Sequence, residues 1–226
     1  MHVDVHHNHT HDHEHNITQE LLCHLPYAIF AVAFGLVILS FISALMLGFH
    51  DAAAAKKGAK VLFHSFHFMH IVFAATGTLI TFFRFSKNFA QAIAVGFFSP
   101  AFFCTMSDAV LPYIGGRLLG VPMQFHLCFL TELPNVLPFL FVGIINGLIM
   151  SRQHHTTLAG FGLSSHAVHI TISSLASIFY LVSHGFTQWY AQIGMVFLFL
   201  IIAVVVPCTF SDIIVPMIVT KKKNIG

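Results

Sequence analysis

Six long apolar stretches constrain what this chain can fold into. They cover residues 25–49, 64–85, 89–114, 126–150, 165–185 and 191–220. A hydrocarbon core about 30 Å thick is crossed by roughly 20 residues of α-helix, so each stretch is long enough to span a bilayer. Only 8% of the residues are charged, against about 25% in soluble domains. The sequence therefore predicts an all-α integral membrane protein with six transmembrane helices, surrounded by the lipid bilayer.

The few charges also limit partners and orientation. A formal net charge of +2 gives no electrostatic basis for nucleic-acid binding. The side of the membrane that holds the N-terminus collects Arg84, Lys87, Arg152 and Lys221 to Lys223, and the other side collects Lys56, Lys57, Lys60 and Arg117. The positive-inside rule then favours a multi-pass protein of the inner or plasma membrane, with both termini in the cytoplasm.

Two segments near the ends of the third and sixth stretches repeat each other. Residues 104–112 read CTMSDAVLP and residues 208–216 read CTFSDIIVP, with five of nine positions identical. Upstream of each, the sequence HFMHI at 67–71 matches HAVHI at 166–170. Because the matches keep the same order, we interpret 20–120 and 121–226 as two related three-helix repeats.

This repeat determines the predicted topology. Three spans per half is an odd number, so the second half must enter the membrane from the opposite side. Inverted repeats of this kind occur in secondary transporters, whose substrate sites lie near the midplane and are lined by discontinuous helices. The third span contains Pro100 and Pro112, and the sixth contains Pro207 and Pro216. Proline interrupts helical hydrogen bonding, so we predict that these two spans are proline-broken helices.

Three acidic residues lie within the apolar stretches, namely Asp108, Glu132 and Asp212. A charge at the bilayer centre costs about 2.5–3.5 kcal/mol, and such residues are functional in most membrane proteins. Asp108 and Asp212 occupy matching positions of the repeat, which favours a shared role. The structural alternative is that they cap broken helices or bind nearby serine and threonine hydroxyls. In a functional site, Ser107 and Ser211 would hydrogen-bond to the neighbouring carboxylates or imidazoles.

Histidines and cysteines accompany these carboxylates. His67 and His70, like His166 and His169, are three residues apart and so share a helix face. His64 extends the first of these faces. Cys104 and Cys208 lie four residues before their respective aspartates, where thiolates would favour softer or borderline ions. The predicted metal site contains His67, His70, Asp108, His166, His169, Asp212, His64, Cys104, Cys208 and Glu132. The alternatives are hydrogen-bonded packing histidines and small apolar cysteines.

The first nineteen residues form a His-rich tail, predicted to be disordered. Its irregular mixture of histidine with acidic residues, between His6 and His15, would make a loose chelating peptide. Residues 1–19 therefore point independently to metal chemistry.

Imidazole and carboxylate ligands together suit Zn, Fe, Mn, Co and Ni. We therefore predict a transporter rather than an enzyme, with a divalent transition metal ion as substrate or ligand at a midplane site. Protons are candidates for coupling, because histidine and aspartate change protonation when a metal leaves. A homo-oligomer or a partner subunit is compatible with the sequence. The alternative function is a membrane oxidoreductase that binds haem or a di-metal centre through the same histidines. A metal-dependent hydrolase ranks last, because no HExxH spacing is present.

Overall fold

The computed structural model describes residues 17–49, 52–152 and 155–221, and these residues form helices without a β-strand. The α-helices are α1 (Ile17–Phe49), α2 (Ala52–Phe85), α3 (Phe89–Thr105), α4 (Leu111–Leu118), α5 (Cys128–Thr131), α6 (Leu133–Met150), α7 (His155–Ser183), α8 (Ile193–Thr209) and α9 (Val215–Lys221). Two π-helical segments, η1 (Met106–Val110) and η3 (Phe210–Ile214), and the 3₁₀ segment η2 (Trp189–Gln192) complete them. The first sixteen residues of the predicted tail, with His6 to His15, lie outside the described residues.

Six helical segments are long and apolar enough to cross a membrane, which confirms the predicted number of spans. They are Leu21–Leu45, Ala53–Phe85, Phe89–Leu118, Leu133–Met150, His166–Ser183 and Trp189–Thr220. The fourth span begins at Leu133 rather than at the predicted residue 126. Gly120, with φ of +81°, ends the preceding helix, and Pro134 occupies the first turn of α6. Proline is favoured at that position because the first turn needs no donor from it.

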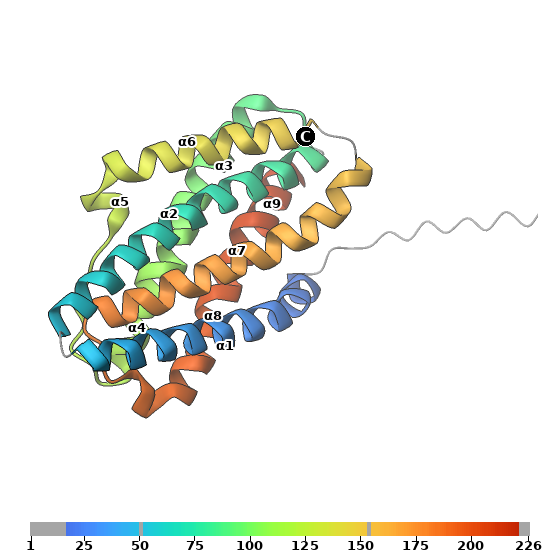
Figure 1. The fold of residues 1–226 in the computed structure, drawn as a ribbon. Helices are drawn as coiled ribbons and strands as arrows, with labels where there is room; N and C mark the ends of the chain where they lie inside the picture. Colours follow the sequence, from blue (N-terminus) through green and yellow to red (C-terminus); the bar gives the residue numbers. More distant parts are fainter. Residues whose placement is uncertain (1–16, 50–51, 153–154, 222–226) are drawn as a thin grey trace, which may run out of the picture.

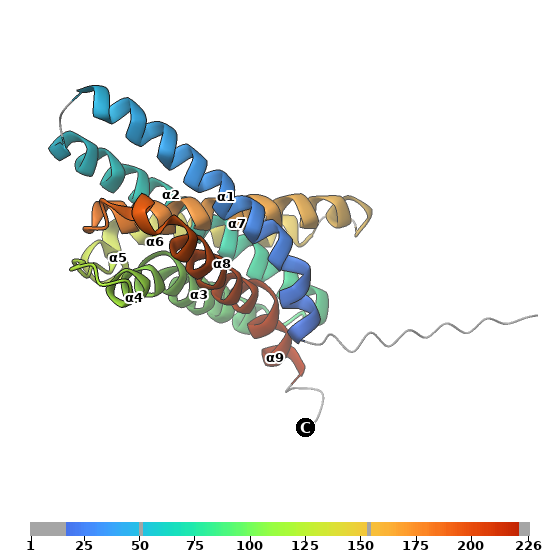
Figure 2. The ribbon, with the colours of Figure 1, turned by 90° about the horizontal axis from the view of Figure 1, so that it is seen from below.

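α2 and α7 form the centre of the molecule. α6 packs on α2 and α1 packs on α7, so four helices lie side by side in the order α6, α2, α7, α1 (Figure 1). α3 and α8 lie behind this layer, as the view from below shows (Figure 2). The central pair runs in opposite directions (Figure 1). Each half therefore places its first helix against the second helix of the other half, and the two halves interlock.

The outside of the helical bundle is apolar and its centre is polar. Large exposed side chains include Phe30, Phe41, Phe98, Phe102 and Leu118. By contrast, three serines of α7, Ser173, Ser174 and Ser177, are fully buried. Lipid tails offer polar groups no hydrogen bonds, so polar groups in a membrane protein must find partners inside the protein. This distribution agrees with a multi-pass membrane protein.

The third and sixth spans pass through the same series of helix types. α3 continues through η1 into α4, and α8 continues through η3 into α9. In each, the first residue of the following α-helix donates its N–H to a carbonyl five residues earlier, the π-helical pattern. The next residue is a proline, Pro112 or Pro216, which has no N–H to donate. The carbonyls of Ser107 and Ser211, five residues before these prolines, therefore lose their backbone donor.

Side chains from the other half supply the missing donors. The Ser177 hydroxyl donates to the carbonyl of Ser107 over 2.9 Å. The Thr78 hydroxyl donates to the carbonyl of Ser211 over 3.1 Å, and the Ser99 hydroxyl donates to the same carbonyl over 3.2 Å. Thr78 and Ser177 are 99 positions apart, the same separation as that of His70 and His169. Each half thus supplies the hydrogen-bond donor that the π-helical segment of the other half lacks.

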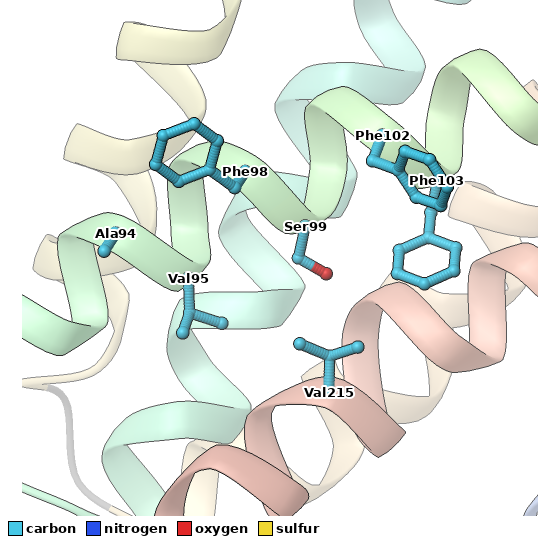
Figure 3. A pocket seen from close by; sticks show the side chains of 7 residues that line it. All are labelled: Ala94, Val95, Phe98, Ser99, Phe102, Phe103 and Val215. Carbon is cyan, nitrogen blue, oxygen red and sulfur yellow. The ribbon is translucent and has the colours of Figure 1, made fainter.

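An open apolar groove with a volume of ≈ 330 Å³ lies between α3 and α9 (Figure 3). Its lining comprises Ala94, Val95, Phe98, Ser99, Phe102, Phe103 and Val215. The groove contains no histidine, cysteine or acidic side chain, so its lining offers only the Ser99 hydroxyl for polar chemistry. The polar cluster described next lies deeper, between the central helices.

Candidate metal centre

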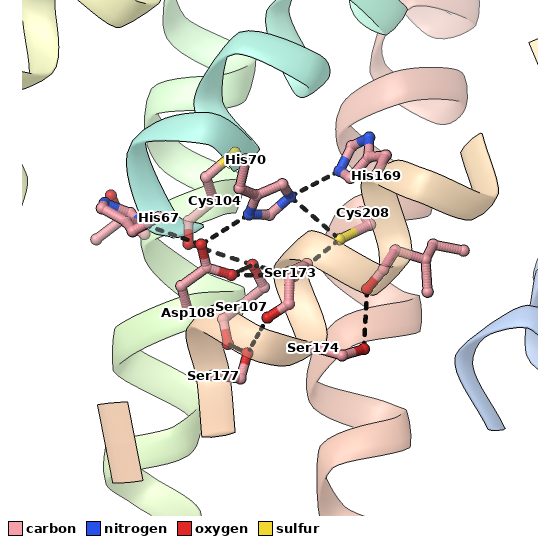
Figure 4. Close-up of polar contacts among 12 residues, drawn as sticks. His67, His70, Cys104, Ser107, Asp108, His169, Ser173, Ser174, Ser177 and Cys208 are labelled. Carbon is pink, nitrogen blue, oxygen red and sulfur yellow. Dashed lines mark hydrogen bonds and ion pairs between the residues drawn. The ribbon is translucent and has the colours of Figure 1, made fainter. Parts of the chain in front are cut away.

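Four of the predicted histidines and aspartates, His67, His70, Asp108 and His169, meet where α2 and α7 cross η1 and the end of α8 (Figure 4). His67 and His70 lie on one face of α2 because residues three apart share a helix face. Asp108 faces them from η1. His169 faces them from α7, one helix turn from Ser173. All five side chains are buried, with exposed fractions of at most 2%.

Asp108 is the most completely bonded group of the cluster. His67 Nδ1 and His70 Nδ1 both donate to Asp108 Oδ2, over 2.9 and 2.7 Å. The hydroxyls of Ser107 and Ser173 donate to Asp108 Oδ1, over 2.6 and 3.0 Å. Four donors around one carboxylate compensate for its removal from water. The predicted contact between Ser107 and Asp108 is therefore present.

His70 and His169 contact each other across the interface between the halves. His70 Nε2 lies 2.6 Å from His169 Nε2. On the far side of each ring, the Nδ1 atom faces a carboxylate: His70 Nδ1 faces Asp108, and His169 Nδ1 lies 2.7 Å from Asp212 Oδ2. A carboxylate only accepts hydrogen bonds, so each Nδ1 carries a proton, and either ring in its neutral form presents an Nε2 lone pair to the other. The result is a continuous Asp–His–His–Asp row.

The second aspartate is less well bonded than the first. Asp212 Oδ2 also lies 3.9 Å from His166 Nδ1. Asp212 Oδ1 and His166 Nε2 are buried, and neither has a hydrogen-bond partner within the described part of the chain. The His166 ring in turn contacts the ring of His24 on α1, with centroids 4.0 Å apart. The hydroxyl of Ser211 lies 3.4 Å from that of Thr78, so the matching serines of the repeat have different partners.

A sulfur atom joins the central pair of histidines. Cys208 Sγ lies 3.6 Å from His70 Nε2 and 3.5 Å from the hydroxyl of Ser173. Cys104 interacts with His70 from the other side (Figure 4). The donor atoms of His70, His169 and Cys208 all lie within 4.8 Å of one another, and all three residues are buried. These groups are close enough to hold a metal ion.

A second set of donors overlaps the first. His166, His169 and Asp212 also place one ligand atom each within 4.8 Å of one another. His169 belongs to both sets and offers Nδ1 to one and Nε2 to the other. Asp212 Oδ2 lies 2.7 Å from His169 Nδ1, so this carboxylate fixes the orientation of the His169 ring. Such carboxylates are regular partners of metal-binding histidines.

A separate cluster lies nearer one end of α2. Here the donor atoms of His64, His126 and Cys128 lie within 4.8 Å of one another. Glu132 Oε1 lies 3.1 Å from His64 Nε2 and 3.7 Å from His126 Nε2. His126 and Cys128 come from the stretch between α4 and α6. The non-helical residues after Gly120 bring this stretch back against α2.

Burial favours the neutral form of two groups in this end cluster, His126 and Cys128. Burial lowers the pKa of His126 below its ordinary value, and the neighbouring His64 lowers it further. Burial also raises the pKa of the Cys128 thiol to about 12 and lowers the pKa of His184, whose ring stacks on that of His126, to about 4. Neutral imidazoles offer the lone pairs that a metal ion needs.

The structure divides the ten predicted site residues between these two clusters. Eight of them surround the contact between the halves: His67, His70, Cys104, Asp108, His166, His169, Cys208 and Asp212. His64 and Glu132 belong to the end cluster. This separation follows the course of α2, because His64 lies nearer the start of that helix than His67 does. Whether any of the ten binds a metal stays a prediction.

Several residues of the site were not predicted. Ser173 aligns with Ala74 at the offset of 99 positions that relates His70 to His169, and His126 and Cys128 lie outside the segments that repeat. The search for repeats therefore could not single them out. Ser173 is one turn after His169 on the same face of α7, a spacing that could have identified it. His126 and Cys128 lie in a stretch without helical periodicity, where the sequence carries no signal for side-chain direction.

No match was found in comparisons with protein-family models, curated proteins and solved structures.

Proposed function

We propose that this protein is a membrane transporter for a divalent transition metal ion, and that the ion binds between His70 and His169. The observation that carries the proposal is the 2.6 Å contact between the Nε2 atoms of these residues. Two neutral imidazoles with their lone pairs facing each other repel at this distance unless a cation lies between them. The buried Cys208 sulfur beside them adds a third donor suited to a metal.

Two cations can occupy this position, a proton and a metal ion. A shared proton fits the 2.6 Å separation directly, since that is hydrogen-bond length. Metal–nitrogen bonds of about 2.0–2.1 Å in tetrahedral geometry hold two nitrogens about 3.3 Å apart, so a metal would move the rings about 0.7 Å further apart. Metal binding would therefore displace the proton. This competition at one nitrogen pair provides a means of coupling metal movement to proton movement.

The arrangement of the two halves supports transport rather than static binding. His70 and His169, Asp108 and Asp212, and Thr78 and Ser177 are pairs of matching residues, and each pair makes related contacts across the interface. We interpret this as an inverted repeat with a pseudo-two-fold axis between α2 and α7. A site on such an axis can face either side of the membrane when one half rocks against the other. The irregular, proline-containing third and sixth spans are the proposed moving elements.

The donor set indicates which ions fit. Two imidazoles and a thiolate favour Zn²⁺, Co²⁺ and Ni²⁺ over Mn²⁺, which prefers oxygen ligands. Asp108 and Asp212 support the site by fixing the ring orientation of His70 and His169 and, when ionised, by offsetting the charge of the ion. Among the predicted metals, Zn²⁺ is the first to test because it suits a tetrahedral nitrogen and sulfur site.

The oxidoreductase alternative has weaker support from the geometry. Bis-histidine haem ligation places the iron and its porphyrin ring between two imidazoles. His70 and His169 are in direct contact, so a haem could bind there only after the central helices moved apart. An intense Soret absorption band in the purified protein would overturn the transport proposal in its present form.

The test is uptake of single metal ions into proteoliposomes that contain the purified full-length chain and an internal metal-sensitive dye. Zn²⁺, Co²⁺, Ni²⁺, Fe²⁺ and Mn²⁺ are compared, with protein-free vesicles as the baseline. His70→Ala and His169→Ala should each abolish uptake, whereas Ser174→Ala should not, because that buried hydroxyl bonds only to the Ile170 carbonyl of its own helix. Uptake no faster than the baseline for all five ions would refute transport. Full uptake in a variant that combines His70→Ala with His169→Ala would refute the site.

A further inference from the structure

The end cluster presents the same electrostatic problem as the centre. His64 Nδ1 bonds to the backbone carbonyl of Lys60 over 2.8 Å. A carbonyl only accepts, so Nδ1 carries the proton and the Nε2 lone pair of a neutral His64 points away from it. That lone pair lies 3.1 Å from Glu132 Oε1, which is also an acceptor when ionised. Two acceptors at this distance require a cation between or beside them.

Two imidazole nitrogens in this cluster lack aligned partners among the residues that the structure describes. His64 Nε2 and His126 Nε2 are both buried without a hydrogen bond, so their contacts with Glu132 are close in distance but wrongly directed. Buried polar atoms without partners are rare in folded proteins, because leaving one unsatisfied is destabilising. Both atoms lie close to Glu132 Oε1, and one ligand atom of each of His64, His126 and Cys128 lies within 4.8 Å of the others.

The backbone that carries two of these donors is firmly attached to α7. The Tyr180 hydroxyl lies 3.1 Å from the backbone nitrogen of His126, which donates to it, and 3.3 Å from the carbonyl of the same residue. The backbone nitrogen of Gln124 donates to the carbonyl of His184 over 2.9 Å. A site whose ligands are already held near their binding positions loses less conformational entropy when a ligand binds.

We infer that His64, His126, Cys128 and Glu132 form a second metal site, distinct from the central one. Two imidazoles, a thiolate and a carboxylate are ligands of four-coordinate Zn²⁺ in proteins. The site would take Zn²⁺ or a borderline ion of similar size, such as Co²⁺. A metal ion binds cysteine as the thiolate, so the arriving ion displaces the thiol proton of Cys128 and forms the metal–sulfur bond.

The position of the second site suggests a use for it, and this use rests on the proposed function. His64 lies three residues before His67 on the same face of α2, and the Phe63 ring stacks on the ring of His67 with centroids 5.5 Å apart. The end site thus adjoins the row of donors that leads through Asp108 to the centre. An ion bound at His64 would be held close to the transport site before it enters.

The site can be tested by Co²⁺ binding to the purified full-length protein in detergent. A Co²⁺–thiolate bond gives a near-ultraviolet charge-transfer band, and the His-rich tail cannot contribute because residues 1–19 contain no cysteine. In a Cys104→Ser/Cys208→Ser background, the band should persist with one Co²⁺ per chain. Adding Cys128→Ser should remove it, and adding His64→Ala should weaken Co²⁺ binding about 10-fold or more. Adding Cys23→Ser, which alters an exposed cysteine of α1, is the matched control and should change neither.

The single variants protect this test against misfolding of the combined ones. In the otherwise wild-type chain, Cys128→Ser should remove the thiolate-bound Co²⁺ ion of the end site and leave the central one. His70→Ala should remove the central ion and leave the ion of the end site. An unchanged band in both Cys128→Ser and His64→Ala overturns the second site. Loss of metal uptake in His70→Ala with this band retained separates the two sites, because the end site then binds without depending on the centre.

Discussion

His70 and His169 touch across the interface between the halves, with 2.6 Å between their Nε2 atoms and a carboxylate behind each ring. If one proton bridges them, a metal ion must displace it. We therefore expect Zn²⁺ binding to release at least one proton per ion from this pair. The measurement is Zn²⁺ titration of weakly buffered protein with a pH indicator, and His70→Ala should lower the proton yield. An equal yield in that variant would show that the protons come from elsewhere.

The two aspartates should differ in their importance for stability. Asp108 accepts from four donors, whereas Asp212 Oδ1 has no partner. An asparagine at 212 can place its amide group on that free side, but an asparagine at 108 must face existing donors with a further donor. We expect Asp108→Asn to lower the free energy of unfolding by about 2 kcal/mol more than Asp212→Asn. Unfolding in graded detergent measures this, and both variants should lose metal uptake.

Two adjacent serines of α7 allow a closely matched comparison. Both are fully buried, but the Ser173 hydroxyl donates to Asp108, whereas the Ser174 hydroxyl bonds only to the Ile170 carbonyl of its own helix. Ser173→Ala should weaken metal binding about 10-fold, the lower end of the range for residues that orient ligands. Ser174→Ala should leave it unchanged. Isothermal titration with Zn²⁺ gives both affinities, and equal values would argue against a role for Ser173.

Gly77 on α2 keeps space open for Asp212. A Cβ atom at this position would lie 2.8 Å from Asp212 Oδ2 and 3.2 Å from its Cγ atom, too close without movement of the aspartate. Gly77→Ala should therefore shift Asp212, disturb His169 and lower metal uptake several-fold. Gly58→Ala on the same helix is the control, because a Cβ there meets nothing within 4 Å. That control should retain uptake and gain about 0.5–1 kcal/mol of stability.

The carbonyls freed by the prolines provide a fourth comparison. The carbonyl of Ser107 accepts from the Ser177 hydroxyl, whereas that of Ser211 accepts from both Thr78 and Ser99. Ser177→Ala should therefore cost about 1–3 kcal/mol, the price of a buried unsatisfied carbonyl. Thr78→Val should cost less, because Ser99 remains. Thermal unfolding in detergent compares them, and a larger loss in Thr78→Val would contradict this account of the π-helical segments.

Much of the architecture could be predicted because membrane-spanning helices leave a local signal. Apolar length identified all six spans, and matched polar residues identified His70, His169, Asp108 and Asp212 as one group. The predicted start of the fourth span was wrong because residues 126–132 are as apolar as part of a membrane-spanning helix. In the structure, these residues form an irregular segment that contains one short helix, α5. The end cluster could not be assembled because His126 and Cys128 have no periodic context.

The sequence by itself determined that this chain has six segments long and apolar enough to cross a membrane and that these segments carry matched histidines and aspartates. Scarcity of charge and helical spacing are local properties, so they can be read without knowing the packing. Only the tertiary structure decided that His70, rather than His67, meets His169, and that His64 belongs to another cluster. The rotation of α2 against α7 sets these contacts. That rotation depends on how side chains from distant parts of the chain fit together, which no local pattern specifies.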